Sequence, residues 1–354
     1  MQDNQIPEWL LKMPKTDLHC HLGGSMRLET ILEFGQKYGI RLPADSPEEL
    51  RKHVVFKDRP EKSLQAYLNC IKICESVLVK PEAFERAAYE VCEDAKKETV
   101  NILELRFGPT NYEKQNLRLF EIVEATLSGL NKAKKELKMH TGLIICGIRT
   151  DMDATKKAAD LAINYQDKGV VGFDLAGKEN GYRPKLFQEI IRSVLKNFLP
   201  VTIHAGEDDT VASIAEALIY LNARRIGHGV SLRESPRIIN NMNSLRTALE
   251  ICPTSNVDTG CVACIDTHPV RDYFNRNLRV TINTDNRTVS DTTVTKELYL
   301  LTQNLGFSPE DIYLLAVNGI KASFMPNEER YPFRRELAEA MKPYGIKKPQ
   351  IYEL

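Results

Sequence analysis

Two of the seven histidines, His19 and His21, lie one residue apart in the stretch KTDLHCHLGGS, at the end of a short apolar run. In a β-strand, residues i and i+2 point to the same side, so both imidazoles would face one direction. Two adjacent imidazoles can form half of a metal site. The same pattern also occurs as a pair of hydrogen-bonded core histidines, so the pair alone leaves both readings open.

Three more residues that could bind a metal follow other apolar runs. His204 lies in TIHAGED, His228 in RIGHG and Asp285 in TINTDN. The active site of a (β/α)8 barrel is at the carboxyl ends of its strands, so these side chains would meet at one rim. Three imidazoles and one carboxylate suit a divalent transition metal, zinc in particular, with a position left for water. A metal lowers the pKa of such a water to about 7, which predicts a hydrolase.

The remaining polar residues at this rim allow two readings each. Glu207 follows His204 by three residues and could donate a proton to a substrate, or could be a capping or first-turn carboxylate of the next helix. His228 could bind the metal or act as a base. The other histidines (His53, His140 and His268) fall in predicted loops or helices, where surface or capping roles suffice.

Eight short apolar runs alternate with helical patterns, and this alternation predicts a parallel sheet. The chain length allows either one large barrel or two ordinary domains. The runs are nearly continuous hydrophobics, as in strands that are buried on both faces, so we expect one α/β domain over residues 1–354, a (β/α)8 TIM barrel. Helices are predicted at Asp151–Tyr165 and Val211–Leu221, among others. The predicted strands are Thr16–Leu22, Asn101–Phe107, Gly142–Ile148, Val170–Leu175, Pro200–His204, Arg225–His228, Ala248–Cys252 and Arg279–Ile282.

The first two predicted strands are separated by far more chain than a crossover helix needs, so extra helices are expected between strands 1 and 2. The most amphipathic segment of this insertion is Ser63–Val77, with Leu64, Tyr67, Leu68, Ile71 and Cys74 at helical spacing. This helix could simply pack on the barrel, or it could form a lid over the barrel mouth.

Composition excludes several classes of protein. Lys+Arg and Asp+Glu are 48 each in 354 residues, and no long basic run offers a footprint for nucleic acid. The N-terminus lacks a signal-peptide pattern and no apolar stretch approaches a membrane span, so a cytoplasmic protein is expected. The eight cysteines are scattered, as buried thiols rather than disulfides would be. Cys261 and Cys264 have metal-like spacing, but no second pair completes a site and chance spacing is the better explanation.

The motifs MPKTDLHCHLGGS, FDLAG, TIHAGE, RIGHG, CPTSN and INTDN occur in the order found in the adenosine deaminase family, which the chain resembles from Met13 to Leu301. This family belongs to the metal-dependent amidohydrolase superfamily. The resemblance implies a (β/α)8 barrel with one Zn2+ per chain that converts adenosine, and 2′-deoxyadenosine, to inosine and ammonia in purine salvage. It implies a purine nucleoside as the small-molecule partner and leaves the oligomeric state open.

Carried over by motif, each functional residue has an implied role. Glu207 resembles the acid that protonates purine N1, which requires a raised pKa. His228 resembles the residue that orients and deprotonates the water, and Gly177 the glycine whose backbone N–H meets purine N3. Leu64 and Tyr67 resemble a hydrophobic gate. The implied zinc ligands are His19, His21, His204 and Asp285.

Two positions depart from the usual family pattern. Many members carry an aspartate that contacts the sugar hydroxyl where this chain has Gly23, so a ribose anchor is missing. Many also read TDD where this chain has Asn286 after Asp285; an asparagine can donate a hydrogen bond to purine N7, so we retain Asn286 as a substrate residue. Because the sugar-contacting aspartate is missing, adenine, AMP and modified adenosines stay open as alternative substrates.

Other functions fit the sequence less well. The zinc deaminase pattern with H-x-E and P-C-x-x-C is absent. A two-metal hydrolase would need a bridging lysine within the fourth strand, and Lys178 lies beyond its end. A catalytically silent zinc-binding interaction protein would be expected to have lost a ligand, the acid or the base, and none is lost.

Overall fold

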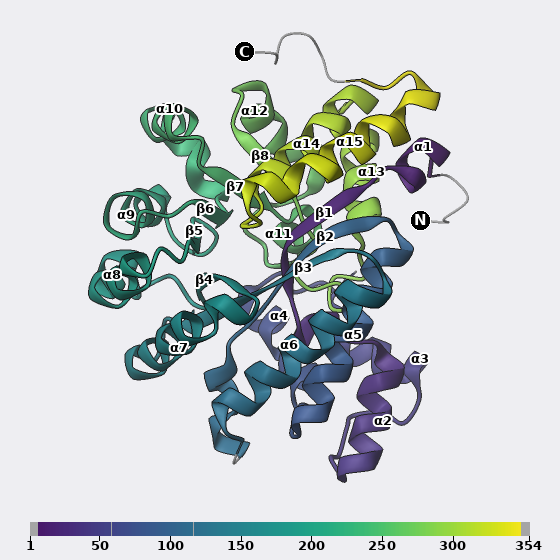
Figure 1. Cartoon of the computed structure of the whole chain (residues 1–354), viewed down its shortest axis with the longest axis vertical. Helices are drawn as coiled ribbons and strands as arrows, with labels where there is room; N and C mark the ends of the chain where they lie inside the picture. Colours follow the sequence, from purple (N-terminus) through teal and green to yellow (C-terminus); the bar gives the residue numbers. More distant parts are fainter. Residues whose placement is uncertain (1–5, 58, 116, 348–354) are drawn as a thin grey trace.

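Eight parallel strands form the centre of the computed structural model, which describes residues 6–57, 59–115 and 117–347. Each strand pairs with the next one in the chain (Figure 1). The backbone N–H of His21 donates to Asp285 O (2.6 Å) and the N–H of Asp285 donates to His19 O (2.8 Å), which joins the first strand to the segment after the last one. The predicted (β/α)8 barrel is therefore confirmed. The strands are β1 (Lys15–His21), β2 (Val100–Phe107), β3 (His140–Ile148), β4 (Val170–Ala176), β5 (Val201–Ala205), β6 (Arg225–His228), β7 (Ala248–Ile251) and β8 (Arg279–Ile282).

Helices follow the strands and surround them (Figure 1). Asp151 caps α7 by accepting a hydrogen bond from the N–H of Ala154, at the residue where this helix was predicted to begin. A proline at the first turn starts α10, α11 and α14. Outside the insertion, the helices are α1 (Glu8–Lys12), α6 (Leu119–Glu136), α7 (Met152–Asn164), α8 (Gln188–Lys196), α9 (Val211–Leu221), α10 (Pro236–Leu245), α11 (Pro253–Asp258), α12 (Val270–Asn275), α13 (Val294–Asn304), α14 (Pro309–Ala322) and α15 (Arg330–Met341).

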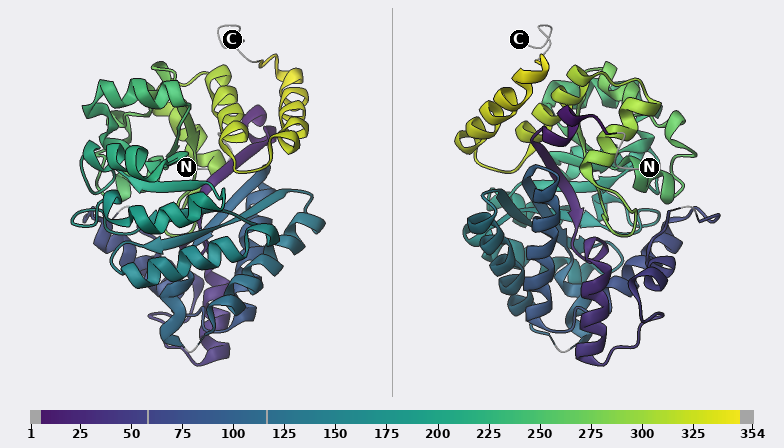
Figure 2. Two further views of the ribbon diagram at one scale, coloured as in Figure 1. Left: turned by 60° about the vertical axis from the view of Figure 1, so that its left-hand side comes forward. Right: turned by 90° about the vertical axis from the view of Figure 1, so that its right-hand side faces the viewer.

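The segment between β1 and β2 contains the predicted extra helices, which are α2 (Leu28–Tyr38), α3 (Pro47–Val54), α4 (Leu64–Glu75) and α5 (Pro81–Lys97). Figure 2 shows α2 and its neighbours at the lower end of the molecule, away from the C-terminal helix α15. The helix predicted at Ser63–Val77 is α4, and Ser63 caps it by accepting from the N–H of Ala66. Its buried face differs from the predicted one: Tyr67, Cys70 and Cys74 are buried, whereas Leu64 and Leu68 are only partly buried.

The strands are less uniformly apolar inside than the sequence suggested. The barrel interior holds fully buried charges, with Arg106 between Asp174 (3.0 Å) and Glu250 (2.9 Å). Arg225 pairs with Glu104 (2.6 Å) in the same interior. These inward residues are spaced among apolar ones, so a pattern of hydrophobic runs does not reveal them.

The cysteines agree with the prediction of buried, unpaired thiols: six are buried, Cys261 is partly buried and Cys264 is exposed. The Cys261 thiol donates to the carbonyl of Asn256 at 3.2 Å. Two histidines contradict the expected surface positions. His140 begins β3 and His268 precedes α12, and both are buried because strand pairing and the site described below enclose them. Within the described ranges, no helix combines the length and hydrophobicity needed to cross a membrane.

Candidate active site

His19, His21 and Asp285 meet at the carboxyl end of β1. The Nε2 atoms of the two histidines lie 3.3 Å apart. Asp285 Oδ1 lies 3.4 Å from Nε2 of His21 and 3.7 Å from Nε2 of His19. The carboxylate of Asp285 lies there because the Asp285 backbone pairs with β1, as described above. The backbone of Asp285 also has a left-handed conformation (φ 59°). Such a conformation is costly for a residue with a side chain and is found at functional sites.

His204 and His228 complete the cluster from β5 and β6. The ring centroids of His204 and His228 lie 4.6 and 4.9 Å from that of His19, and one nitrogen of each of these three rings lies within 4.8 Å of the others. His228 also has a left-handed backbone conformation (φ 61°), which turns the chain directly after the strand. The four histidines and the aspartate that the sequence predicted at one rim are therefore brought together.

Two buried carboxylates orient the histidine rings toward each other. Glu250 Oε2 accepts from Nδ1 of His19 (2.9 Å), and Asp174 lies 3.0 Å from Nδ1 of His204. A proton on Nδ1 leaves the Nε2 lone pair of each ring free for a metal. Burial holds the pKa of His19 and of His21 well below its usual value, which favours the neutral imidazole that a metal requires.

Arg106 lies between the two orienting carboxylates and stabilises the ionised form of Asp174. Burial by itself would raise the pKa of Asp174, but His204 and Arg106 together lower it well below its usual range. Arg106 also pairs with Glu250 (2.9 Å) and donates to the carbonyl of Leu18. The sequence reasoning missed Asp174, Glu250 and Arg106; Asp174 lies within the motif FDLAG, and that motif was the only signal for any of them.

Glu207 faces the cluster. Its Oε2 lies 3.5 Å from Nε2 of His228, and burial raises its pKa to about 7, with His204 opposing and Glu179 supporting the shift. Glu179 accepts from the backbone N–H groups of Gly206 (2.8 Å) and Glu207 (2.9 Å), which anchors this turn. The alternative role as a capping or first-turn carboxylate is wrong, since α9 begins only at Val211 and is preceded by Thr210.

A chain of hydrogen bonds behind His228 assigns the position of its proton. The backbone N–H of Val270 donates to Nδ1 of His268 (3.1 Å), so a neutral His268 carries its proton on Nε2 and donates to Oδ1 of Asn256 (3.2 Å). The amide nitrogen of Asn256 then donates to Nδ1 of His228 at 2.9 Å. A neutral His228 therefore carries its proton on Nε2, the nitrogen that faces the site. The sequence reasoning missed this role of His268.

Two of the residues expected to bind the substrate follow strands β4 and β8. Gly177 directly follows β4 with φ 91°, a conformation that favours glycine, and a Cβ at this position would have no neighbour closer than 3.6 Å. Asn286 donates from Nδ2 to Asp285 Oδ1 (2.8 Å), while its buried Oδ1 has no partner among the described residues. Both positions therefore leave polar groups and space beside the cluster.

The other expected substrate residues belong to α4 and the end of β1. Tyr67 of α4 is buried and its hydroxyl lies 2.8 Å from that of Ser290, whereas Leu64, one turn earlier, is partly exposed. Gly23 lies two residues after His21, against α4. The helix and the turn after β1 thus adjoin each other at the barrel mouth.

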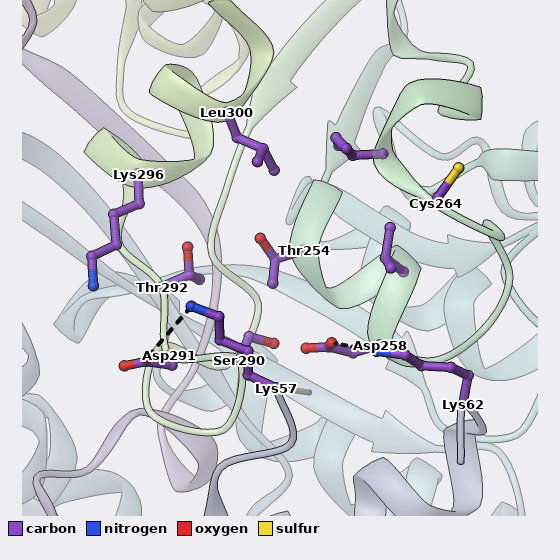
Figure 3. A pocket seen from close by; sticks show the side chains of 12 residues that line it. Lys57, Lys62, Thr254, Asp258, Cys264, Ser290, Asp291, Thr292, Lys296 and Leu300 are labelled. Atoms are coloured by element: carbon purple, nitrogen blue, oxygen red, sulfur yellow. Dashed lines mark ion pairs between the residues drawn. The ribbon is translucent and has the colours of Figure 1, made fainter. Parts of the chain in front are cut away.

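A cavity of about 320 Å³ lies next to this cluster (Figure 3). Its lining includes Ser290, whose hydroxyl lies against that of Tyr67, and Thr254. Thr254 precedes Ser255 in the chain, and the hydroxyl of Ser255 donates to Asp285 Oδ2 (2.6 Å). Lysines at its edge form ion pairs, of which Figure 3 shows Lys57 with Asp291 (4.0 Å). The lining includes none of the residues predicted as metal ligands, acid, base or substrate contacts, so this cavity is distinct from the histidine cluster.

Comparison with known proteins identifies the family. The family model described as adenosine deaminase matches residues 14–340. The chain is 36% identical over 330 residues to the adenosine deaminase of Enterococcus faecalis, which covers 93% of this chain and 97% of the relative. Among solved structures, the adenine deaminase of Arthrobacter aurescens superposes with a TM-score of 0.87 at 25% identity, covering 93% of this chain and 99% of that one. The Arabidopsis N6-mAMP deaminase superposes with a TM-score of 0.82 at 26% identity, covering 94% and 100%. The chain therefore belongs to the adenosine deaminase family and is a C–N hydrolase that deaminates substrates of the adenosine type.

Proposed function

We propose that this protein hydrolyses adenosine and 2′-deoxyadenosine to inosine and ammonia, using one zinc ion held by His19, His21, His204 and Asp285. The observation that carries the proposal is the convergence of these ligand atoms beside a glutamate whose pKa is raised to about 7. The identity to adenosine deaminases over nearly the whole chain supports the nucleoside as substrate.

The donor atoms of His19, His21 and Asp285 have the spacing of a zinc site, and His204 joins His19 and His228 in a second group of ligand atoms. Zn–N distances of about 2.1 Å in a tetrahedral site imply ligand atoms about 3.4 Å apart. The Nε2 atoms of His19 and His21 lie 3.3 Å apart. Asp285 Oδ1 lies 3.4 Å from Nε2 of His21 and 3.7 Å from Nε2 of His19, so all three separations match that spacing. When bound, the ion would make hydroxide available from water at neutral pH by lowering the pKa of the water to about 7.

Glu207 supplies the proton that the ring needs. Addition of an oxygen nucleophile at purine C6 moves an electron pair onto N1, and a protonated carboxyl there neutralises the charge as it forms. At neutral pH about half of a carboxyl group with a pKa near 7 is protonated, whereas an ordinary glutamate would be almost fully ionised. The proton ends on N1 of inosine, and Glu207 recovers a proton from the attacking water.

His228 orients the attacking oxygen by donation rather than by accepting a proton. Its Nδ1 accepts a hydrogen bond from Asn256, so the Nε2–H group points to the site. Burial lowers the pKa of the ring to about 4, which keeps the ring neutral. A neutral ring with a proton on Nε2 can donate a hydrogen bond to the oxygen and hold it against C6. The second proton of the water leaves with the amino group as ammonia.

Gly177 and Asn286 are proposed to position the purine. The absence of a side chain at Gly177 lets the ring approach the backbone N–H at the end of β4. The amide of Asn286 has an unpaired Oδ1 and a second Nδ2 hydrogen for the ring. α4, with Tyr67 and Leu64, is proposed to cover the mouth after the substrate enters, since His19, His204 and Asp285 are buried while His21 is still partly exposed.

The test is to measure ammonia release from adenosine, 2′-deoxyadenosine, adenine and AMP by the protein loaded with one equivalent of zinc. We expect adenosine and its 2′-deoxy form to be preferred, and His21→Ala to abolish turnover and lower zinc content. His53→Ala, which changes an exposed histidine of α3, serves as the matched control and should retain both. A preference for adenine or AMP would refute the substrate assignment, and full activity without zinc would refute the metal.

A further inference from the structure

Gly23 is a glycine because of space rather than backbone conformation. Its φ is not in the left-handed region, so other residues could adopt its backbone conformation. A Cβ on Gly23, however, would lie 2.5 Å from Cγ and 2.7 Å from Oε1 of Glu75, distances that real Cβ atoms do not show. The side chain of Glu75 therefore fills the space into which a residue at position 23 would project.

Glu75 is the last residue of α4, which packs against the turn after β1, and its carboxyl lies beside Gly23 there. Only Leu22 lies between His21 and Gly23, so their Cα atoms are two peptide units and at most about 7.6 Å apart. The hydroxyl of Tyr112, in the 3-10 helix Pro109–Gln115 after β2, also faces this carboxyl. Glu75, Gly23 and Tyr112 thus come together where the first two strands end.

The carboxyl of Glu75 has few partners in this position. Among the residues that the structure describes, it forms no ion pair, and the buried hydroxyl of Tyr112 is the polar side chain placed against it. Burial raises the pKa of Glu75 to about 7, while Tyr112 and Lys72 oppose the shift. A poorly solvated carboxyl without a cation gains from a hydroxyl donor placed against it.

We propose that Glu75 binds the sugar hydroxyl of the nucleoside and thereby selects a nucleoside over the free base and over the 5′-monophosphate. This inference rests on the proposed function. The carboxylate that many family members carry at position 23 is supplied here by α4, which reaches the same space from another part of the chain. A carboxylate accepts a hydrogen bond from a ribose hydroxyl, whereas it repels a phosphate group at the same place.

The first experiment compares Glu75→Gln and Glu75→Ala with the zinc-loaded wild type. We expect kcat/KM for adenosine to fall about 10- to 100-fold in Glu75→Ala, the range for a lost hydrogen bond to a charged group, and less in Glu75→Gln. The inhibition constant of inosine should rise by the same factor, whereas that of hypoxanthine, which has no sugar, should change less than about twofold. The ratio of AMP to adenosine turnover should rise in both variants, because the negative charge is removed.

The second experiment moves the carboxylate to position 23, in the turn after β1. Gly23→Asp alone should lose activity, because its Cβ would meet the Glu75 side chain at 2.5 Å. Gly23→Asp combined with Glu75→Ala removes that clash and should recover adenosine turnover and inosine binding above those of Glu75→Ala alone. A rise in inosine binding without a matching rise in hypoxanthine binding would separate this role from a purely structural role of Glu75.

The outcomes separate the two hypotheses. Equal weakening of inosine and hypoxanthine in Glu75→Ala, or unchanged inosine binding, would overturn the role of Glu75 and leave the deaminase function intact. Failure of the double variant to exceed Glu75→Ala would also overturn it. A wild-type protein that deaminates none of the adenosine-type nucleosides would instead refute the proposed function itself.

Discussion

Glu207→Gln tests the central chemical step, since it keeps the size of the side chain and removes the transferable proton. Burial raises the pKa of Glu207 from 4.5 to about 7. At pH 7 a carboxyl with a pKa of 4.5 is about 0.3% protonated and one with a pKa of 7 is half protonated, so the shift enriches the acid form about 150-fold. A general acid contributes about 10²- to 10⁴-fold to a rate. We therefore expect kcat for adenosine to fall at least about 100-fold while zinc content is unchanged.

The pH dependence has a definite sign. Glu207 acts in its protonated form, so its contribution is present below a pH of about 7 and is lost as pH rises through its raised pKa. In the wild type, kcat/KM should fall about tenfold per pH unit on the alkaline side, and Glu207→Gln should lack this limb. The assay is ammonia release across pH 5–9, with Glu189→Gln, an exposed glutamate of α8, as control. A Glu207→Gln variant with more than a tenth of wild-type kcat would refute the reasoning.

Three further changes probe the residues behind the metal ligands. Asp174→Asn should weaken zinc binding about 10- to 100-fold in a chelator competition, since this carboxylate orients a ligand ring, while the exposed Asp160→Asn should not; equal affinities would argue against the role. Arg106→Met should lower the unfolding free energy of the metal-free protein by about 3–5 kcal/mol in urea titrations, because two buried carboxylates lose their cation; a loss below about 1 kcal/mol would contradict this. Asn256→Asp places an acceptor at Nδ1 of His228 and moves its proton away from the site, so kcat should fall about tenfold or more; an unchanged or higher kcat would favour His228 as the base.

Much of the fold was predictable because its signals are local. The eight apolar runs correspond to the eight strands, and α9 has the same bounds as its predicted helix. The position of His19, His21, His204 and His228 at strand ends followed from the strand boundaries, because parallel strands bring their carboxyl ends to one rim. The buried face of α4 was predicted less well, since Leu64 and Leu68 are apolar but lie on the side that is only partly covered.

The residues behind the site were not predictable in the same way. Asp174 and Glu250 lie in strands that read as hydrophobic, and only the closed barrel directs them inward onto the ligand rings. His268 looked like a surface histidine because its neighbours in the chain are turn residues. Its contact with Asn256 depends on how the segments after β7 fold back on the barrel.

The sequence by itself determined the order of the strands, the residues at their ends and the kind of chemistry those residues can perform, because periodicity and motif spacing are properties of neighbouring positions. Only the tertiary structure decided which nitrogen of His228 carries a proton, which carboxylates hold the ligand rings, and that Glu75 fills the space beside Gly23. These properties arise from contacts between residues far apart in the chain, and their distances and burial exist only once the barrel has closed.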